Sequence, residues 1–224
     1  MSRAEPSVEL LEARRAAACA SEGRSEDAIL RMIGSAVGSA GRRFPFAVDI
    51  GCGRGDLWPS LSPFVDRYIG CDLLRYDEFP ADVELRLADL NGRFPFEDAT
   101  ADLVVSAETI EHLENPRAFL REVARIAKAG ALVVVTTPNQ LSLLSKACLL
   151  LKNRFAGFQA VQYPAHITAL LESDLLLVAA EVGLAQPRIV YSDSGRIPGT
   201  ARHWPGQLRG RTFSDNIALV ATKP

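Results

Sequence analysis

The sequence predicts an α/β protein with a doubly wound, mostly parallel seven-stranded sheet, an antiparallel last strand and helices on both faces. Seven short apolar runs recur along its 224 residues, many of them ending at Gly or Asp, and helical or loop segments separate them. That alternation is typical of parallel sheets whose crossover connections pack on the two faces. A Gly- and Arg-rich connection joins the last two runs, which indicates antiparallel pairing there.

Two helices are expected before the first strand, at residues 6–20 and 25–40. Ser25 is placed to open the second helix, which carries two acidic residues in its first turn, and Gly41 is placed to end it. We expect residues 1–43 to form an N-terminal helical cap and residues 44–224 to form the main domain.

The strands follow this cap. Asn115 and Pro116 are typical of the start of a further helix, which should pack on the sheet and end at Gly130. The predicted strands are residues 47–51, 68–72, 83–89, 102–106, 131–137, 188–192 and 216–223.

The nearly balanced charge of the chain does not point to a strongly charged binding partner. The 25 Lys and Arg residues against 27 Asp and Glu give a net charge of −2, so there is no overall electrostatic case for nucleic acid or an anionic membrane, although local patches stay open. The four cysteines show no CxxC spacing, and MSRAEPSVELLEARR at the start lacks the apolar core of a secretory signal. We therefore expect a cytoplasmic monomer or homodimer with reduced thiols.

A glycine-rich bend closes the first strand. Its pattern is D-x-G-x-G-x-G, in which Asp49 is followed by Gly51, Gly53 and Gly55, and glycines there let backbone amides approach a ligand. A nicotinamide dinucleotide fingerprint would need a third glycine where this chain has Asp56.

Two further carboxylates end the next strands. Asp72 can accept hydrogen bonds from both ribose hydroxyls, and Asp89 can accept one from an adenine amino group. Together with Asp49, which suits a cationic tail, they describe a site for an adenosine that carries such a tail.

Four segments resemble the class I S-adenosylmethionine-dependent methyltransferases in order and spacing: VDIGCGRGD, GCDL, ADLNGRFPFEDATADLVVSAETIEHL and LVVVTTPN. The resemblance runs from about residue 44 to the C-terminus and implies a Rossmann-like methyltransferase that uses S-adenosylmethionine. It implies that Gly51, Gly53 and Gly55 lie under the methionine part and that Asp72 binds the ribose. The remaining residues expected in the cofactor site are Asp49, Cys52, Leu73, Asp89, Leu90 and Ala107.

SAETIEHLENP, residues 106–116, carries the chemistry expected at the acceptor end. Glu108, Glu111 and His112 are spaced i, i+3 and i+4, so one helical turn would bring them to one face. With His166, which follows the TTPN strand, they would form the ligand set of a divalent ion such as Mg²⁺ or Mn²⁺. E-x-x-E-H followed by a downstream His resembles the ubiquinone-pathway O-methyltransferases and the small-RNA 3′-end 2′-O-methyltransferases.

A second interpretation needs no metal. Glu-His-Leu is common at this place in methyltransferases without an ion, where the glutamates orient the cofactor or cap the turn and the histidine packs. In that case His112 or His166 would be the general base, and the catalytic residues would come from His112, His166 and Glu108. The RNA specificity does not carry over, because residues 167–171 lack the aromatic and acidic stretch of that group.

Two segments stay open. Residues 141–158 are too interrupted by charges to span a membrane, and they are either an amphipathic lid for a lipid-like substrate or membrane surface, or a helix packed on the domain. The connection at 192–216 is either a solvated loop or an anion site, and its arginines are Arg196, Arg202, Arg209 and Arg211.

Together these features predict methyl transfer to an oxygen of a small-molecule, lipid-like or quinone-like acceptor. The alternatives are an RNA 3′-end 2′-O-methyltransferase and a non-catalytic, cofactor-binding interaction module.

Overall fold

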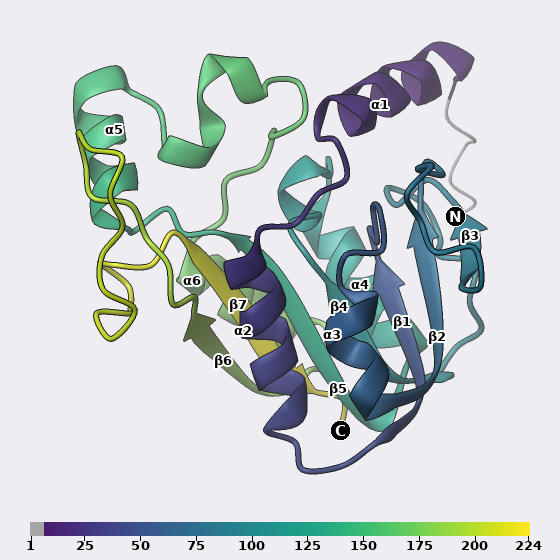
Figure 1. Cartoon of the computed structure of the whole chain (residues 1–224). Coiled ribbons are helices and arrows are strands. Elements are labelled where there is room, and N and C mark those ends of the chain that lie inside the picture. Colours follow the sequence, from purple (N-terminus) through teal and green to yellow (C-terminus); the bar gives the residue numbers. More distant parts are fainter. Residues whose placement is uncertain (1–6) are drawn as a thin grey trace.

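A single seven-stranded sheet forms the centre of the computed structural model, which describes residues 7–224 (Figure 1). The strand order is β3-β2-β1-β4-β5-β7-β6. Strands β1 to β5 pair in parallel, whereas β7 is antiparallel to both β5 and β6. The strands are β1 Phe44–Ile50, β2 Val65–Asp72, β3 Glu84–Leu87, β4 Ala101–Ser106, β5 Ala127–Pro138, β6 Ala185–Tyr191 and β7 Asn216–Thr222. All seven predicted strands and the antiparallel end of the sheet are confirmed.

Helices cover both faces of the sheet, as predicted. On one face, Ile33 and Val37 of α2 pack with Leu61 of α3, and on the other, Phe119 of α4 and Leu175 of α6 join the core. The α-helices are α1 Val8–Ala20, α2 Asp27–Gly38, α3 Trp58–Leu61, α4 Pro116–Ile126, α5 Leu143–Lys152 and α6 Glu172–Glu181. The 3-10 helices are η1 Ser62–Phe64, η2 Ile110–His112, η3 Ala156–Phe158 and η4 Ala160–Gln162.

Two helix boundaries differ from the predicted ones because the backbone there forms a hydrogen bond to another segment or already belongs to a strand. The predicted cap by Ser25 is wrong, because its backbone N–H donates to Asp56 and α2 begins at Asp27. The helix α4 has the predicted Asn115 cap, but it ends at Ile126 rather than Gly130, since β5 already begins at Ala127.

The two N-terminal helices differ in burial and in position relative to the sheet. Helix α2 lies in the core, whereas α1 has no buried residue and stands apart from the sheet, above the carboxyl ends of its strands (Figure 1). Residue 6, the predicted start of the first helix, lies outside the described residues. The division at residue 43 into a cap and a main domain stays a prediction.

The segment after β5 also leaves the body of the molecule. In α5 only Ser145 is buried, while Leu150 and Leu151 are 86% and 84% exposed. Whether residues 141–158 act as a lid or only pack on the domain stays a prediction. None of the described helices combines the length and the apolar character needed to cross a bilayer. All four cysteines are free, as predicted.

The topology fixes where a ligand can bind. The strand order runs outward in opposite directions from β1 and β4, which are neighbours in the sheet. In open α/β sheets, ligands occupy the crevice outside the carboxyl ends of the strands at such a switch point. The glycine bend after β1 and the 106–116 segment after β4 both lie there.

Candidate functional site

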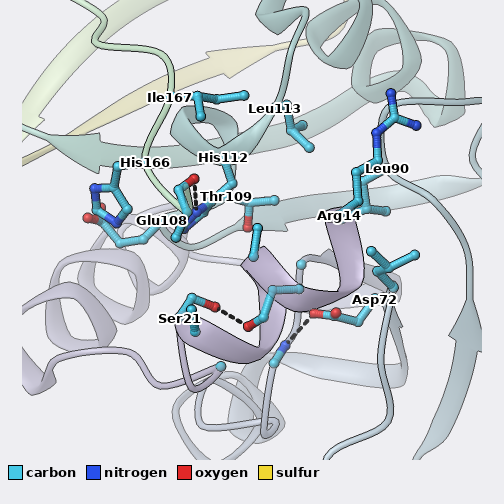
Figure 2. A pocket seen from close by; sticks show the side chains of 18 of the residues that line it. Arg14, Ser21, Asp72, Leu90, Glu108, Thr109, His112, Leu113, His166 and Ile167 are labelled. Atoms are coloured by element: carbon cyan, nitrogen blue, oxygen red, sulfur yellow. Dashed lines mark hydrogen bonds between the residues drawn. The ribbon is translucent and has the colours of Figure 1, made fainter. Parts of the chain in front are cut away.

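A pocket of about 550 Å³ opens at the carboxyl ends of the strands, with α1 on one side and residues 161–167 on another. Figure 2 shows that Arg14, Asp72 and Leu90 lie at one end of the pocket, while Glu108, His112 and His166 lie at the other. This volume falls within the range of about 300 to 1,000 Å³ that is typical of small-molecule sites.

The glycine bend is tightly enclosed. Gly53 has φ +50°, and a Cβ atom there would lie 2.2 Å from the carbonyl oxygen of Gly23 in the connection between α1 and α2. The same carbonyl accepts a hydrogen bond from the N–H of Arg54 at 2.9 Å. Gly53 is thus required both by its backbone angle and by the close approach of the N-terminal segment.

Asp72 is held by the bend and keeps capacity for a ligand. Its Oδ2 accepts from the N–H of Gly53 at 2.9 Å, and its Oδ1 accepts from the N–H of Leu74 at 3.1 Å. Burial raises the pKa of Asp72, while these backbone donors lower it. Because each carboxylate oxygen can accept about two hydrogen bonds, Asp72 can still receive two hydroxyl groups from the pocket.

Asp49 lies below the pocket rather than in its wall. Its Oδ2 accepts from the hydroxyl of Tyr68 at 2.5 Å, and its Oδ1 is buried without a hydrogen-bond partner. Burial raises the pKa of Asp49 to about 7, although the Tyr68 hydrogen bond opposes this. Its predicted contact with a cationic tail stays a prediction.

The raised pKa of Asp49 predicts a pH-dependent stability. Since the folded state holds this proton up to about pH 7 and the unfolded state releases it near 3.9, the free energy of unfolding falls as pH rises between these values. Each tenfold change in proton affinity is about 1.4 kcal/mol, or roughly 3 to 5 °C in Tm for a chain of this size. We expect Asp49→Asn to raise Tm by at least about 3 °C more at pH 8 than at pH 5. Asp66→Asn, at the exposed start of β2, should show no such difference, and an equal shift at both pH values for Asp49→Asn would contradict the prediction.

A residue that the sequence did not single out closes the Asp72 end of the pocket. Arg14 of α1 forms an ion pair with Asp89 and a second one with Glu114, at 2.8 Å. Asp89 also accepts from the N–H of Asn91 at 3.0 Å. Asp89, which was predicted to accept a hydrogen bond from an adenine amino group, therefore already connects α1 to the segment after β3. Arg14 and Asp89 are 75 positions apart, and no pattern in the sequence linked them.

Glu108 adopts a conformation that the predicted helical turn does not include. Its φ is +47°, in the left-handed region that non-glycine residues rarely occupy, and only residues 110–112 form the short helix η2. Its Oε1 accepts from Thr136 at 3.0 Å and its Oε2 from Asn216 at 3.1 Å. The predicted helical turn through residues 108–112 is thus wrong, and strain of this kind is common at functional sites.

Glu111 is completely buried beside Glu108. Its Oε2 accepts from the hydroxyl of Thr137 at 3.1 Å, and its Oε1 has no hydrogen-bond partner. Burial raises the pKa of Glu111 to about 8, and burial together with the charge of Glu111 raises that of Glu108 well above its usual range. At neutral pH this pair of carboxyl groups therefore retains at least one proton when nothing else is bound.

The two histidines meet at the pocket wall. Their ring centroids are 4.7 Å apart, and His112 Nδ1 is 2.8 Å from the carbonyl oxygen of Ala165. Since a carbonyl only accepts, Nδ1 carries the hydrogen, and Nε2 is the unprotonated nitrogen of the neutral ring. Burial lowers the pKa of both rings, and that of His166 falls to about 4 with a further contribution from His112. Both are therefore neutral at pH 7.

Three of the four predicted metal-binding residues lie together. One donor atom each of Glu111, His112 and His166 lies within 4.8 Å of the others, whereas Glu108 is not part of this group. His166 Nδ1 is also buried without a partner. Neutral imidazole nitrogens and a carboxylate oxygen are suitable ligands for a divalent transition metal.

The pocket wall includes most of the predicted site residues. Those that line it are Gly51, Gly53, Asp72, Leu73, Asp89, Leu90, Ala107, Glu108, His112 and His166. Those that do not are Asp49, Cys52, Gly55 and Glu111. None of the four arginines of the 192–216 connection lines the pocket, and Arg196 and Arg211 instead pair with Asp215 and Glu172. The roles assigned to all these residues stay predictions.

Comparisons with known proteins agree with this architecture. Residues 48–135 match the family model of the methyltransferase domain. A probable S-adenosylmethionine-dependent methyltransferase of Mycobacterium tuberculosis is 33% identical over 42% of this chain and 36% of its own length. The ubiquinone biosynthesis O-methyltransferase of Maricaulis maris is 29% identical over 42% of this chain and 41% of its own length. The chain thus spans about two fifths of the length of these relatives.

The fold is also that of solved structures. A SAM-dependent methyltransferase from Archaeoglobus fulgidus superposes with a TM-score of 0.61 at 17% identity, covering 87% of this chain and 94% of that one. The superposition covers more of this chain than residues 48–135, the segment matched by the family model.

Proposed function

We propose that this chain, whose residues 48–135 match the methyltransferase domain, transfers the methyl group of S-adenosylmethionine to an oxygen of a lipid-like or quinone-like acceptor. One observation carries the proposal. A single pocket has the carboxylate of Asp72 at one end and the neutral imidazole of His112 at the other. A cofactor held by its ribose at Asp72 would then meet an acceptor beside His112.

The residues at the Asp72 end fit an adenosine with a cationic tail. Gly51 and Gly53 present backbone without side chains at the pocket wall, and Asp72 has oxygens free to accept both ribose hydroxyls. Leu90, mostly buried at the same end, supplies an apolar surface for an adenine ring. S-adenosylmethionine bound there supplies the electrophilic methyl group.

At the other end, His112 can take the proton of an acceptor hydroxyl. The hydrogen bond from Nδ1 to Ala165 fixes its tautomer and leaves Nε2 as the proton acceptor. This transfer would leave the acceptor oxygen able to bond to the methyl carbon as the carbon–sulfur bond breaks, with the proton held on His112. Holding both reactants in line is the larger part of such catalysis.

As an alternative to the base, we propose that Glu111, His112 and His166 hold a divalent ion, in which case the lone pair of His112 binds the ion and takes no proton from the acceptor. The unpartnered Oε1 of Glu111 and Nδ1 of His166, both buried, support this, since buried polar atoms without partners are rare. A bound ion would lower the pKa of an acceptor hydroxyl. A proton retained by the pair Glu108 and Glu111 would be released when a cation bound.

The apolar character of the acceptor rests on the rim of the pocket. Leu113, Val161 and Ile167 line it beside the histidines, and Val161 is 88% exposed. The relative from Maricaulis maris is named as a ubiquinone biosynthesis O-methyltransferase. That name supports an oxygen atom of a quinone-like molecule as the methyl acceptor.

Binding of the cofactor tests the proposal directly. Calorimetry should show micromolar affinity for S-adenosylmethionine and S-adenosylhomocysteine, and Asp72→Ala should weaken both by roughly ten- to a hundredfold, about 1.5 to 3 kcal/mol, because a charged hydrogen-bond acceptor is lost. Asp66→Ala, the same change at the other end of β2, should leave both affinities unchanged. No binding to the unchanged protein would overturn the proposed function. Incubation of lipid, quinone and RNA fractions with methyl-labelled cofactor would then identify the acceptor class.

A further inference from the structure

Charge is strongly segregated along this nearly neutral chain. Residues 141–171 and 194–213, here called the basic apolar end, contain seven of its 25 Lys and Arg residues and none of its 27 Asp and Glu residues. The other 173 residues therefore carry 18 basic and 27 acidic side chains, a net charge of −9. The overall charge of −2 conceals this separation.

The two segments lie together in the structure. The N–H of Leu143 donates to the carbonyl of Thr212 at 2.8 Å, and the side chain of Asn139 donates to the carbonyl of Arg211 at 2.9 Å. Figure 1 shows α5 and the C-terminal connection at one end of the molecule, projecting beyond the sheet. The basic apolar end is therefore one continuous surface.

Exposed apolar side chains gather on the same surface. Among the described residues, twelve large apolar side chains are exposed, and eight of them belong to the basic apolar end. These eight are Leu143, Leu149, Leu150, Leu151, Val161, Tyr163, Ile167 and Leu208. A surface helix normally turns polar residues outward, but on α5 the outward positions 143, 146 and 150, spaced i, i+3 and i+7, are Leu, Lys and Leu.

The cations of this surface are available to a partner. Across residues 7–224, no ion pair to a carboxylate involves five of the seven, Lys146, Lys152, Arg154, Arg202 and Arg209. Lys152 directly follows Leu150 and Leu151 in the sequence, and Arg154 is two positions further on. Leucines that reach into a lipid layer beside cations that contact anionic head groups are the pattern of helices lying in a membrane interface.

We propose that the basic apolar end docks on the surface of an anionic lipid bilayer. The exposed side chains are mainly aliphatic and stand on a projecting helix, which suits insertion between lipids better than stacking of nucleic-acid bases. The surface is continuous with the pocket, because Val161 and Ile167 belong to both. Docking would bring the acceptor end of the pocket to the membrane, where an apolar acceptor is concentrated.

Vesicle binding tests the proposal with the full chain and no cofactor or acceptor, so the result does not depend on the proposed function. Sedimentation with phosphatidylglycerol–phosphatidylcholine vesicles should show binding that weakens as salt rises, and pure phosphatidylcholine should bind at least tenfold more weakly. Leu150→Ser with Leu151→Ser should lower the affinity at least tenfold, with an unchanged Tm, since both side chains are already exposed. Neutralising Lys146, Lys152 and Arg154 to Gln should cost about fivefold per charge.

The matched control is Leu87→Ser with Leu177→Ser, which removes two exposed leucines, 59% and 70% exposed, outside the basic apolar end. This variant should bind vesicles as the unchanged protein does. The proposal is overturned if anionic vesicles do not bind, if neutral vesicles bind equally well, or if the double leucine variant keeps full affinity. Single-stranded RNA that displaces the protein from vesicles, with binding unaffected by the leucine changes, would indicate a nucleic-acid surface instead.

Discussion

Replacing His112 with alanine is expected to lower the rate of methyl transfer by about two to four orders of magnitude, the usual contribution of a general base. The imidazole is neutral at pH 7, its tautomer is fixed by Ala165, and the ring lies at the acceptor end of the pocket. Cofactor affinity should change by less than about threefold, because Asp72 and the glycine bend are untouched. Single-turnover rates and calorimetry measure the two effects separately.

His203→Ala is the matched control, since the third histidine is exposed in the C-terminal connection and does not line the pocket. It should keep full activity. Full activity of His112→Ala would show that the imidazole takes no part in the reaction.

Removal of metal by a chelator distinguishes metal-assisted transfer from transfer in which His112 is the general base. If Glu111, His112 and His166 bind a divalent ion, exhaustive treatment with EDTA should abolish transfer without displacing the cofactor, and added Mn²⁺ should restore it. Glu111→Gln and His166→Ala should then reproduce the loss seen with His112→Ala. Activity that survives exhaustive chelation would contradict the metal proposal and leave His112 as the base acting alone.

Gly53→Ala is expected to reduce cofactor affinity by at least about a hundredfold, or 2.7 kcal/mol, and to lower Tm by about 6 °C or more. A left-handed alanine costs about 1 to 2 kcal/mol, and its Cβ would also lie 2.2 Å from the Gly23 carbonyl oxygen. Since a backbone atom cannot rotate away, either the bend or the 22–25 connection must move. That movement takes the Gly53 N–H away from Asp72.

Gly41→Ala separates the two causes. Gly41 has φ +64°, but a Cβ there would meet nothing within 4 Å. Its substitution should cost only the strain of the backbone angle, about 2 to 4 °C for each 1 kcal/mol in a chain of this size, and cofactor affinity should be unchanged. Equal losses for the two variants would show that the contact with Gly23 is unimportant.

The sequence predicted those parts of the molecule that depend on local pattern. The seven strands, the glycine bend and the placement of Asp72 at the end of β2 all follow from alternating apolar runs and the residues that end them. His112 and His166 were expected on one edge of the sheet, and they meet there because both follow strands that end at that edge.

The parts that were missed depend on contacts between distant segments. The conformation of Glu108 is stabilised by Thr136 and Asn216, which reach it from β5 and β7, and local spacing instead suggested a helix. Thr136 and Thr137 do end the strand beside β4, so their meeting with the two glutamates could have been inferred from strand order. The ion pair of Arg14 with Asp89 could not be predicted from strand order or from any local sequence pattern.

The position of β7 has a consequence for biosynthesis. This strand is the last of the seven to be made, yet it lies between β5 and β6 rather than at an edge. Until the ribosome has released it, β5 presents an unpaired apolar edge, which is a site of misassembly in nascent chains. Asn216, the first residue of β7, also supplies a hydrogen bond to Glu108. The growing polypeptide can therefore assemble its cofactor end early, but its acceptor end matures only when the final strand is inserted.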